Sequence, residues 1–186
     1  MKKLMVLAVA ALLVGLMVPA MCGAVDLISD GRDTAFKAGE VTFSFDGANF
    51  TVTVSAAAPW CLKDVHIDVQ KNLADFPTLK KGNPNLKAFA YKQDFDFEVS
   101  ACTSSVSQSF TGFNAGDPVY VAVHAAIVNK TIADSNADGE VDVDVNGDGL
   151  LDANDYTYES AWISGTPFGG KNWGMYLTTT VPAPTP

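Results

Sequence analysis

Several stretches of the chain alternate apolar and polar residues with a period of two, which is the pattern of a β-strand with one buried face. Residues 41–45 and 49–55 alternate in this way, and Asp46, Gly47 and Ala48 between them predict a hairpin loop. The same alternation recurs in residues 64–69, 94–100 and 172–180. All of these segments are therefore expected to be strands that pack one face against a core.

Residues 118–128 form a longer and more uniformly apolar run, as expected for a central strand covered on both faces. Residues 71–91 break the rhythm because they are rich in Pro, Gly and Lys, and they are expected to form a long ordered loop. No segment shows a convincing amphipathic helix. About six to eight strands joined by Gly, Pro and Asn turns predict an all-β fold, specifically a β-sandwich of immunoglobulin-like or jelly-roll-like type.

The N-terminal segment is typical of a secretory signal peptide: Lys2 and Lys3 precede an apolar run, and small residues follow that run. We expect cleavage after either Ala20 or Ala24. A lipoprotein anchored at Cys22 is a less favoured alternative, because the residues before it are not the small ones that such a site requires. An uncleaved membrane anchor is also less favoured, because the apolar run is short for a membrane span.

The expected organisation is a leader over residues 1–24, a single domain over 25–180 and a Pro/Thr-rich tail over 181–186. The domain carries an acidic insertion at 131–158 in a connection between two strands. The product is expected to be secreted or associated with a cell surface, with no membrane span after cleavage of the leader.

Beyond the leader the chain has two cysteines, Cys61 and Cys102. Two thiols in one domain of an exported protein usually pair, so a disulfide is expected, with two unpaired buried thiols as the alternative. Closing a loop of this length stabilises a fold by about 3–4 kcal/mol in the chain-entropy model. The two residues are not spaced as CxxC, which leaves redox catalysis without support.

The net charge of −9 comes from one segment of the chain. No Lys or Arg lies between Lys130 and Lys171. The acidic residues in this interval are Asp134, Asp138, Glu140, Asp142, Asp144, Asp148, Asp152, Asp155 and Glu159. The other acidic and basic residues cancel each other, and this local acidity argues against nucleic-acid binding.

The second half of the acidic segment has the spacing of an EF-hand-like calcium loop, which offers oxygens at positions 1, 3, 5, 7, 9 and 12 and a glycine at position 6. When Asp144 is taken as position 1, Gly149 falls at the glycine position. The predicted ligands are Asp144, Asn146, Asp148, Leu150 through its carbonyl, Asp152 and Asp155. Leu151, at position 8, is expected to pin the loop to a core.

The first half of the segment fits the same spacing incompletely. Its candidate ligands are Asp134, Asn136, Asp138 and Asp142, with Glu140 beside them. Position 12 is Val145, whose side chain cannot ligate a cation, and the two frames share Asp144 and Val145. The segment therefore predicts two overlapping loops in tandem, with an acidic surface loop that holds no metal as the alternative.

At these residues the chain resembles two known families. The stretch DVNGDGLLDAND resembles the calcium loop of dockerin modules, and the ten-residue spacing of its Asp motifs resembles thrombospondin type-3 repeats. Both resemblances imply calcium ligation by the residues named above. A dockerin has two loops that are each followed by a helix, and the overlapping frames leave no room for those helices. Cohesin binding, the function of dockerins, is therefore not implied.

More of the chain is similar to exported microbial β-domains of unassigned function. The similar blocks are WCLKDVHIDV, GNPNLKAFAY, VYVAVHAAIV and ESAWISGTPFGGKNWGMYLT. This similarity implies export and a β fold, and it brings no catalytic residues with it.

The two histidines, His66 and His124, lie on the strand faces opposite the apolar positions of their strands. If these strands are neighbours the imidazoles can meet, with Glu159 as a candidate third residue of a metal or acid/base site. Two hydrogen-bonded histidines without a metal are the favoured alternative. No nucleophile elbow supports Ser/His/Asp catalysis.

The aromatic residues offer one more candidate site. Trp60, Trp162, Trp173 and Tyr176 are candidates for a sugar-stacking platform, and aromatic residues at the edge of a core are the favoured alternative. Asn49 and Asn129 each begin a glycosylation triplet.

Together these features predict a non-enzymatic, exported, calcium-binding β-sandwich with a structural or adhesive role at a microbial cell surface or extracellular matrix. Calcium is the expected cofactor, and the expected partners are other surface proteins, further copies of the chain, or polysaccharide. A carbohydrate-binding module that uses the tryptophans and a secreted hydrolase that uses the histidines are the two alternatives.

Overall fold

The computed structural model describes residues 22–29, 35–95, 102–131, 133–136 and 140–185. Residues 1–21, which hold most of the expected leader, lie outside the described residues. Strand β1 (Cys22–Ser29) begins inside the expected leader, so cleavage after Ala20 would leave this strand whole and cleavage after Ala24 would shorten it. No helix in the described part of the chain is long and apolar enough to cross a membrane.

The fold is all-β, as the sequence predicted. The strands after β1 are β2 (Phe36–Phe45), β3 (Asn49–Ala56), β4 (Cys61–Gln70), β5 (Tyr91–Asp94), β6 (Ser105–Thr111), β7 (Pro118–Asn129), β8 (Thr157–Ile163), β9 (Thr166–Pro167) and β10 (Met175–Thr180). Short 3₁₀-helices occur at η1 (Leu73–Asp75), η2 (Leu86–Ala88) and η3 (Ala153–Asp155). The strand expected over 94–100 falls mostly outside the described residues.

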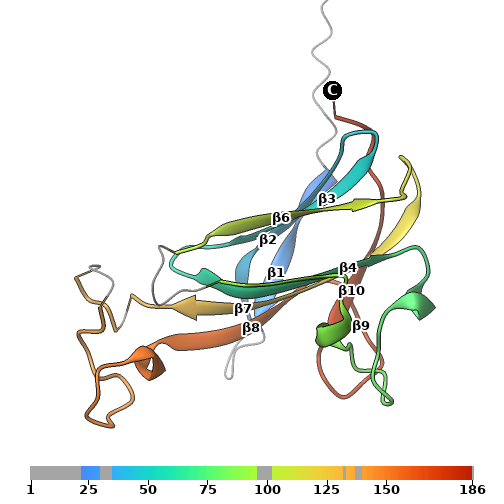
Figure 1. The fold of residues 1–186 in the computed structure, drawn as a ribbon. Helices are drawn as coiled ribbons and strands as arrows, with labels where there is room; N and C mark the ends of the chain where they lie inside the picture. Colours follow the sequence, from blue (N-terminus) through green and yellow to red (C-terminus); the bar gives the residue numbers. More distant parts are fainter. Residues whose placement is uncertain (1–21, 30–34, 96–101, 132, 137–139, 186) are drawn as a thin grey trace, which may run out of the picture.

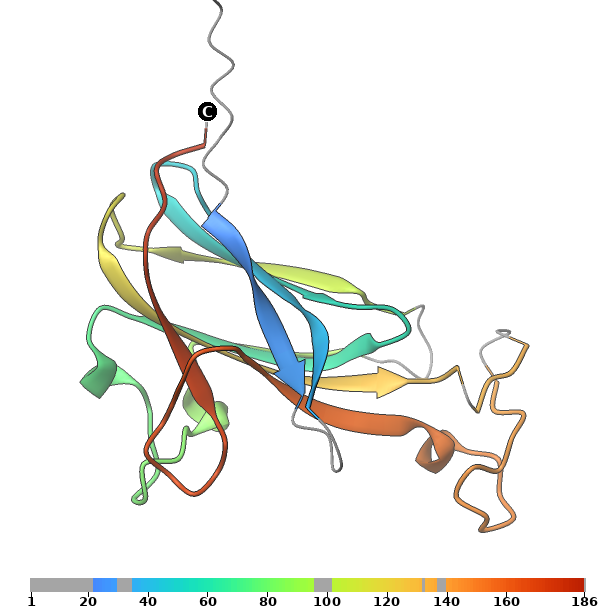
Figure 2. The same cartoon turned by 180° about the vertical axis from the view of Figure 1, so that it is seen from behind.

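The strands pair antiparallel in the order β5-β4-β7-β8-β1-β2-β3-β6, and β10 joins β7 and β9 beside this path. They form one curled sheet that nearly closes on itself, with β2, β3 and β6 on one side and β4, β7 and β8 on the other (Figure 1). Strand β1 links the two sides, because it pairs with both β2 and β8 (Figure 2). Since this pairing makes the sheet continuous, the expected sandwich of two separate sheets is not confirmed.

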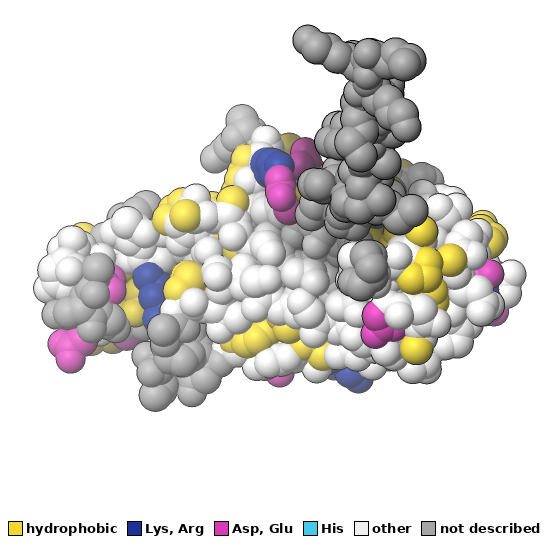
Figure 3. Space-filling model, turned by 90° about the horizontal axis from the view of Figure 1, so that it is seen from above, with side chains coloured by type: hydrophobic (Ala, Val, Ile, Leu, Met, Phe, Trp, Pro, Cys, Tyr) yellow, Lys and Arg dark blue, Asp and Glu magenta, His cyan; other side chains and the backbone are white. Residues whose placement is uncertain are grey.

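The central core lies between the two sides of the curled sheet and follows the alternation of the strands. Its buried side chains include Val41, Phe43, Phe50, Val52, Val54, Val65, Ile67, Val121, Val123, Ala125, Ile127, Ala161 and Ile163. The opposite face of β3 and β6 is polar: the hydroxyls of Thr51 and Ser109, and those of Thr53 and Ser107, are each 2.8 Å apart. Seen from this side, the surface shows few charged side chains (Figure 3).

The predicted hairpin between β2 and β3 is held by its first loop residue. The Asp46 carboxylate accepts hydrogen bonds from the backbone N–H groups of Ala48 (2.8 Å) and Asn49 (2.7 Å). Gly47 adopts a φ of 96°, a left-handed conformation that glycine tolerates without strain. The turn therefore forms because an Asp side chain can bond to the backbone that follows it and because Gly accepts a positive φ, which is why Asp-Gly predicts a turn.

A second apolar cluster covers the outer face of β7 and β8. The loop expected over residues 71–91 ends at residue 90, because Tyr91 begins β5. It contributes Phe76 and Phe89 to this cluster, and the loop after β9 contributes Phe168. These rings pack against Ala122 and Trp162 on the sheet. The two loops also bind each other, because the Asn83 side-chain oxygen accepts a hydrogen bond from the Asn172 backbone N–H (3.0 Å). Ordered loops therefore cover part of the outer face of the sheet.

Candidate functional site

The acidic segment connects the neighbouring strands β7 and β8 and projects beyond their ends (Figures 1 and 2). A small apolar cluster of Cys61, Val128, Ala133 and Tyr156 forms its base. The Ala133 carbonyl accepts hydrogen bonds from the backbone N–H groups of Asp142 (2.6 Å) and Val143 (3.1 Å). The segment is therefore tied to the sheet at its base, whereas its tip lies in solvent.

The loop from Asp144 to Asp155 turns where the calcium-loop pattern requires it to turn. The two Asp144 carboxylate oxygens accept hydrogen bonds from the backbone N–H groups of Gly147 (2.6 Å) and Gly149 (2.8 Å). Gly147 and Gly149 have φ angles of 77° and 84°. A side chain at either glycine would be strained, so the conformation explains why glycine occupies position 6.

Asp155 closes the loop from its other end. Its carboxylate accepts hydrogen bonds from the backbone N–H groups of Val145 (2.8 Å), Asn146 (3.1 Å) and Asp152 (3.1 Å), and the residue is 2% exposed. The bond from Asn146, followed by those from Asp152 and Val145, outweighs the effect of burial and lowers the Asp155 pKa. The carboxylate is therefore ionised and joins the first and last turns of the loop.

Leu151 does not pin the loop to a core, which corrects the expectation for position 8. Its exposed fraction is 57%, and that of Leu150 is 61%. Both side chains lie in the part of the segment that projects away from the sheet. Two neighbouring leucines are thus presented to solvent.

The other predicted ligands of this loop bond to nearby backbone. Asn146 accepts from Asp148, Asp148 accepts from Leu150 and Asp152 accepts from Asn154, all at 2.8–2.9 Å. Asp138, in the first frame, lies outside the described residues. Asp134 is buried at the base, Asn136 and Glu140 are exposed, and Asp142 accepts a hydrogen bond from Ser135 (3.0 Å). Calcium ligation by either frame stays a prediction.

Within the described residues, one group of three or more His, Cys, Asp or Glu side chains is placed to share a metal ion: Asp64, His66 and His124, whose ligand atoms lie within 4.8 Å of one another. His66 and His124 are direct partners across β4 and β7, with ring centroids 5.5 Å apart. The expectation that the two imidazoles meet is therefore confirmed. Both lie on the outer face of the sheet, beside the second apolar cluster.

One carboxylate oxygen of Asp64 faces both rings. It lies 3.2 Å from His66 Nδ1 and 3.8 Å from His124 Nδ1, and within the described part of the chain neither of these buried nitrogens has a well-aligned hydrogen bond. At its other nitrogen, His124 Nε2 lies 2.9 Å from the Ser160 hydroxyl. The His124 ring also meets the Trp162 ring edge-on, with centroids 5.0 Å apart.

Burial controls the protonation of this group. It lowers the pKa of His124 to about 4; the Asp64 charge opposes this shift and the His66 charge adds to it. Burial alone would raise the pKa of Asp64, but contact with His66 and the charges of both histidines outweigh it and lower that pKa. At neutral pH, His124 is therefore neutral and Asp64 is ionised.

Glu159 is not the third member of this group, which corrects the sequence-based expectation. It pairs with Ile127 across β7 and β8, and its carboxylate lies 3.4 Å from the Ser29 hydroxyl. Ile127 faces the central core, so Glu159 belongs to the opposite side of the sheet from His124. Asp64 takes its place, and its spacing two residues before His66 was a signal for a shared strand face.

The four aromatic candidates do not form one platform. Trp60 stacks on Phe36, with centroids 5.4 Å apart, at the edge of the central core. Trp162 is 5% exposed and belongs to the second apolar cluster, where Trp173 and Tyr176 are partly buried. Trp60 therefore lies apart from the other three, and Trp162 has almost no surface to offer a sugar.

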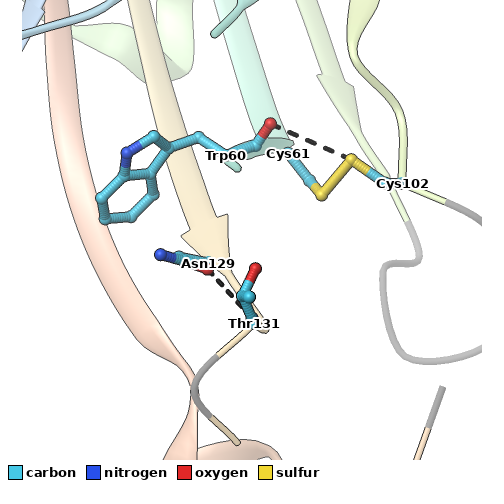
Figure 4. The surroundings of a disulfide bond; sticks show 5 residues. All are labelled: Trp60, Cys61, Cys102, Asn129 and Thr131. Carbon is cyan, nitrogen blue, oxygen red and sulfur yellow. Dashed lines mark hydrogen bonds between the residues drawn. A yellow bond between two sulfur atoms is a disulfide. The ribbon is translucent and has the colours of Figure 1, made fainter. Parts of the chain in front are cut away.

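The expected disulfide joins Cys61, the first residue of β4, to Cys102, with Cα atoms 5.2 Å apart (Figure 4). Cys61 is buried and Cys102 is exposed. Asn129, the first residue of one glycosylation triplet, ends β7 nearby and accepts a hydrogen bond from the Thr131 N–H (2.9 Å). The Cys61–Cys102 disulfide is consistent with an extracellular protein.

Comparison of the chain with models of known protein families, with curated proteins and with solved structures gives no match.

Proposed function

We propose that the protein is an exported, calcium-stabilised β-domain, sandwich-like in the way its two sides face each other, with a structural or adhesive role at a microbial cell surface or extracellular matrix. Calcium is bound by the loop from Asp144 to Asp155, and the incomplete frame that begins at Asp134 supplies further acidic oxygens. Ordering of the loop fixes the connection between β7 and β8.

The turn at Asp144 is the observation that carries this proposal. Its carboxylate holds the N–H groups of Gly147 and Gly149, and both glycines have positive φ. Asp155, at the last ligand position, bonds back to Val145 and Asn146. This support comes from the closed shape of the loop and from the ligand spacing. Calcium would then neutralise carboxylates that otherwise repel one another.

The adhesive part of the proposal is supported by exposed apolar side chains on the same loop. Leu150 and Leu151 are 61% and 57% exposed, and Val143 and Val145 are 41% and 45% exposed. Apolar side chains grouped on a projecting segment are a feature of contact surfaces. Calcium would present them in one conformation to a neighbouring surface protein or to another copy of the chain.

Calcium titration followed by calorimetry and thermal unfolding tests the proposal. A structural extracellular site needs a Kd of only about 10⁻⁴–10⁻³ M. At about 5 mM calcium, such a site would stabilise the fold by about 1–2 kcal/mol, which raises Tm by roughly 2–8 °C. Chelator should reverse the shift, and dynamic light scattering in the same samples reports calcium-driven assembly.

Asp148→Asn is the informative variant, because the amide keeps an oxygen for the Leu150 N–H and loses the charge. Asp46→Asn is its matched control, since Asp46 holds a similar turn in the β2–β3 hairpin. The Asp148 variant should lose the calcium-induced rise in Tm, whereas the Asp46 variant should keep it. A wild-type protein whose Tm does not change at millimolar calcium would contradict the proposal.

The two alternative functions differ in their support. The carbohydrate-binding alternative is weakened by the burial of Trp162 and by the separate position of Trp60. The hydrolase alternative keeps one favourable observation, the contact of His66 and His124 with Asp64. The group of Asp64, His66 and His124 is separate from the acidic segment for which calcium is proposed.

A further inference from the structure

The Nδ1 atoms of the two histidines are buried polar atoms that need a partner. Among the described residues, Nδ1 of His66 and Nδ1 of His124 are buried without a well-aligned hydrogen bond, and the same Asp64 oxygen lies 3.2 and 3.8 Å from them. Buried polar atoms in native proteins nearly always have a partner. Two such nitrogens beside one carboxylate oxygen match the ligand types of a zinc-class ion.

We propose that Asp64, His66 and His124 bind a divalent transition-metal ion of the zinc class. A tetrahedral ion with bonds of about 2.0–2.1 Å holds its ligand atoms about 3.3 Å apart. The separations of 3.2 and 3.8 Å to Asp64 are already close to that value. The ligand atoms all lie within 4.8 Å of one another, so small side-chain rotations would bring them around one ion.

The ligand types select the metal. Calcium and magnesium take oxygen ligands, whereas two imidazole nitrogens and one carboxylate suit zinc and its neighbours in the transition series. The group is therefore chemically distinct from the acidic segment, whose candidates offer only oxygen. One domain would hold two cation sites that do not compete for the same ion.

The surroundings prepare the ligands for an ion. A neutral imidazole is the form that ligates a metal ion, and His124 is the more buried of the two rings. Ser160 engages Nε2 of the same ring, which leaves Nδ1 toward Asp64. A hydrogen bond at the second nitrogen is the usual way in which proteins orient a metal-binding histidine. Trp162 fixes the ring from the side.

A lysine on the neighbouring strand is engaged by a backbone carbonyl. Lys92 is the partner of His66 across β4 and β5, but its Nζ donates a hydrogen bond to the Lys87 carbonyl (2.7 Å). The three ligand side chains keep exposed fractions of 23%, 18% and 12% for Asp64, His66 and His124. An ion held by three protein side chains near the surface keeps a position for water or for a ligand from a partner.

The test uses the full mature chain, stripped of metal and held in millimolar calcium so that the acidic segment is occupied. Zinc binding is measured by calorimetry, and bound Co²⁺ is measured by its visible absorption, which reports nitrogen ligands and low coordination number. We expect one zinc per chain with micromolar or tighter affinity. His66→Ala and Asp64→Asn should each weaken binding at least about tenfold and change the cobalt spectrum.

The controls separate this site from the acidic segment and from a folding defect. Asp148→Asn should leave zinc affinity and the cobalt spectrum unchanged. His124→Gln replaces the buried ring, so circular dichroism and the unfolding midpoint must first establish that the variant folds; His66→Ala and Asp64→Asn carry the test if it does not. The proposal would be overturned by wild-type zinc affinity in both His66→Ala and Asp64→Asn. Loss of zinc binding in Asp148→Asn, or no zinc binding by the wild type, would also overturn it.

Discussion

His66 on β4 lies directly opposite His124 on β7, and their ring centroids are 5.5 Å apart on the outer face of the sheet. This contact follows from strand parity, since the residues on either side of each histidine point into the central core. Trp162 on β8 is the next residue in the same cross-strand row. The row therefore places two imidazoles where neither the core nor bulk solvent fully surrounds them.

Acid should destabilise the metal-free protein through His124. An imidazole in the unfolded chain titrates near 6.5, whereas burial lowers the His124 pKa to about 4 in the fold. Between these values the unfolded state binds a proton that the folded state does not bind. The free energy of unfolding should therefore fall as pH drops from about 6.5 to 4, by up to about 3 kcal/mol.

Urea unfolding over this pH range, in chelator, measures the effect. Asp64 has a lowered pKa, so its own contribution is lost only below its ordinary value of 3.8, outside this window. His124→Gln should remove most of the pH dependence between 6.5 and 4. An unchanged pH dependence in that variant would show that another group controls acid stability.

How far the sequence anticipates this site is a matter of parity and register. Alternation alone places His66 and His124 on outer faces. The same rule, applied to β8, places Trp162 outside and Ala161 and Ile163 in the core. Glu159 has the parity of those core positions, so its failure to join the histidines was open to deduction. The pairing of β4 with β7, and the register that sets His66 opposite His124, could not be deduced from the sequence, because both depend on contacts across the fold.

Other parts of the fold gave weaker signals. Strand β6 (Ser105–Thr111) has few apolar residues, since one face is exposed and its serines bond to hydroxyls on β3. The second apolar cluster joins Phe76 to Phe168, more than 90 residues later, through loops without periodicity. The hairpin loop at Asp46 was predictable because its turn is set by its own residues.

Replacement of Trp162 should act on stability before it acts on any ligand. The side chain is 5% exposed and packs against His124 and Phe168. Trp162→Ala should lower the free energy of unfolding by about 3–5 kcal/mol, measured by urea denaturation. Trp173→Ala, at a partly buried position, should cost less. Equal, small losses in the two variants would contradict the assigned packing, and loss of polysaccharide retention is informative only for Trp173.

Gly39 should tolerate no side chain, although its backbone is ordinary strand. It lies in β2 between β1 and β3, and a Cβ there would collide with the Ser55 carbonyl oxygen. Gly39→Ala should therefore force the strands apart and cost about 1–3 kcal/mol. Gly169→Ala, in the loop after β9, is the control, since no described atom lies within 4 Å of its added Cβ. Thermal unfolding of the two variants should separate them clearly, and equal Tm values would contradict this register.

Reduction of the Cys61–Cys102 disulfide should lower stability mainly through the unfolded chain. The bond closes a loop of 41 residues, for which the chain-entropy model gives about 3–4 kcal/mol. Cys102 is exposed, so Cys102→Ser removes the bond and leaves the buried Cys61 in its apolar cluster with Val128 and Tyr156.

This variant should match the reduced wild type in urea unfolding, and reductant should not change it further. Cys61→Ser should be less stable than Cys102→Ser, because it also places a hydroxyl in the apolar cluster at the base of the acidic segment. Equal stability of the oxidised and reduced wild type would show that the fold does not depend on the bond. The reverse order of the two variants would show that Cys61 is not packed as described.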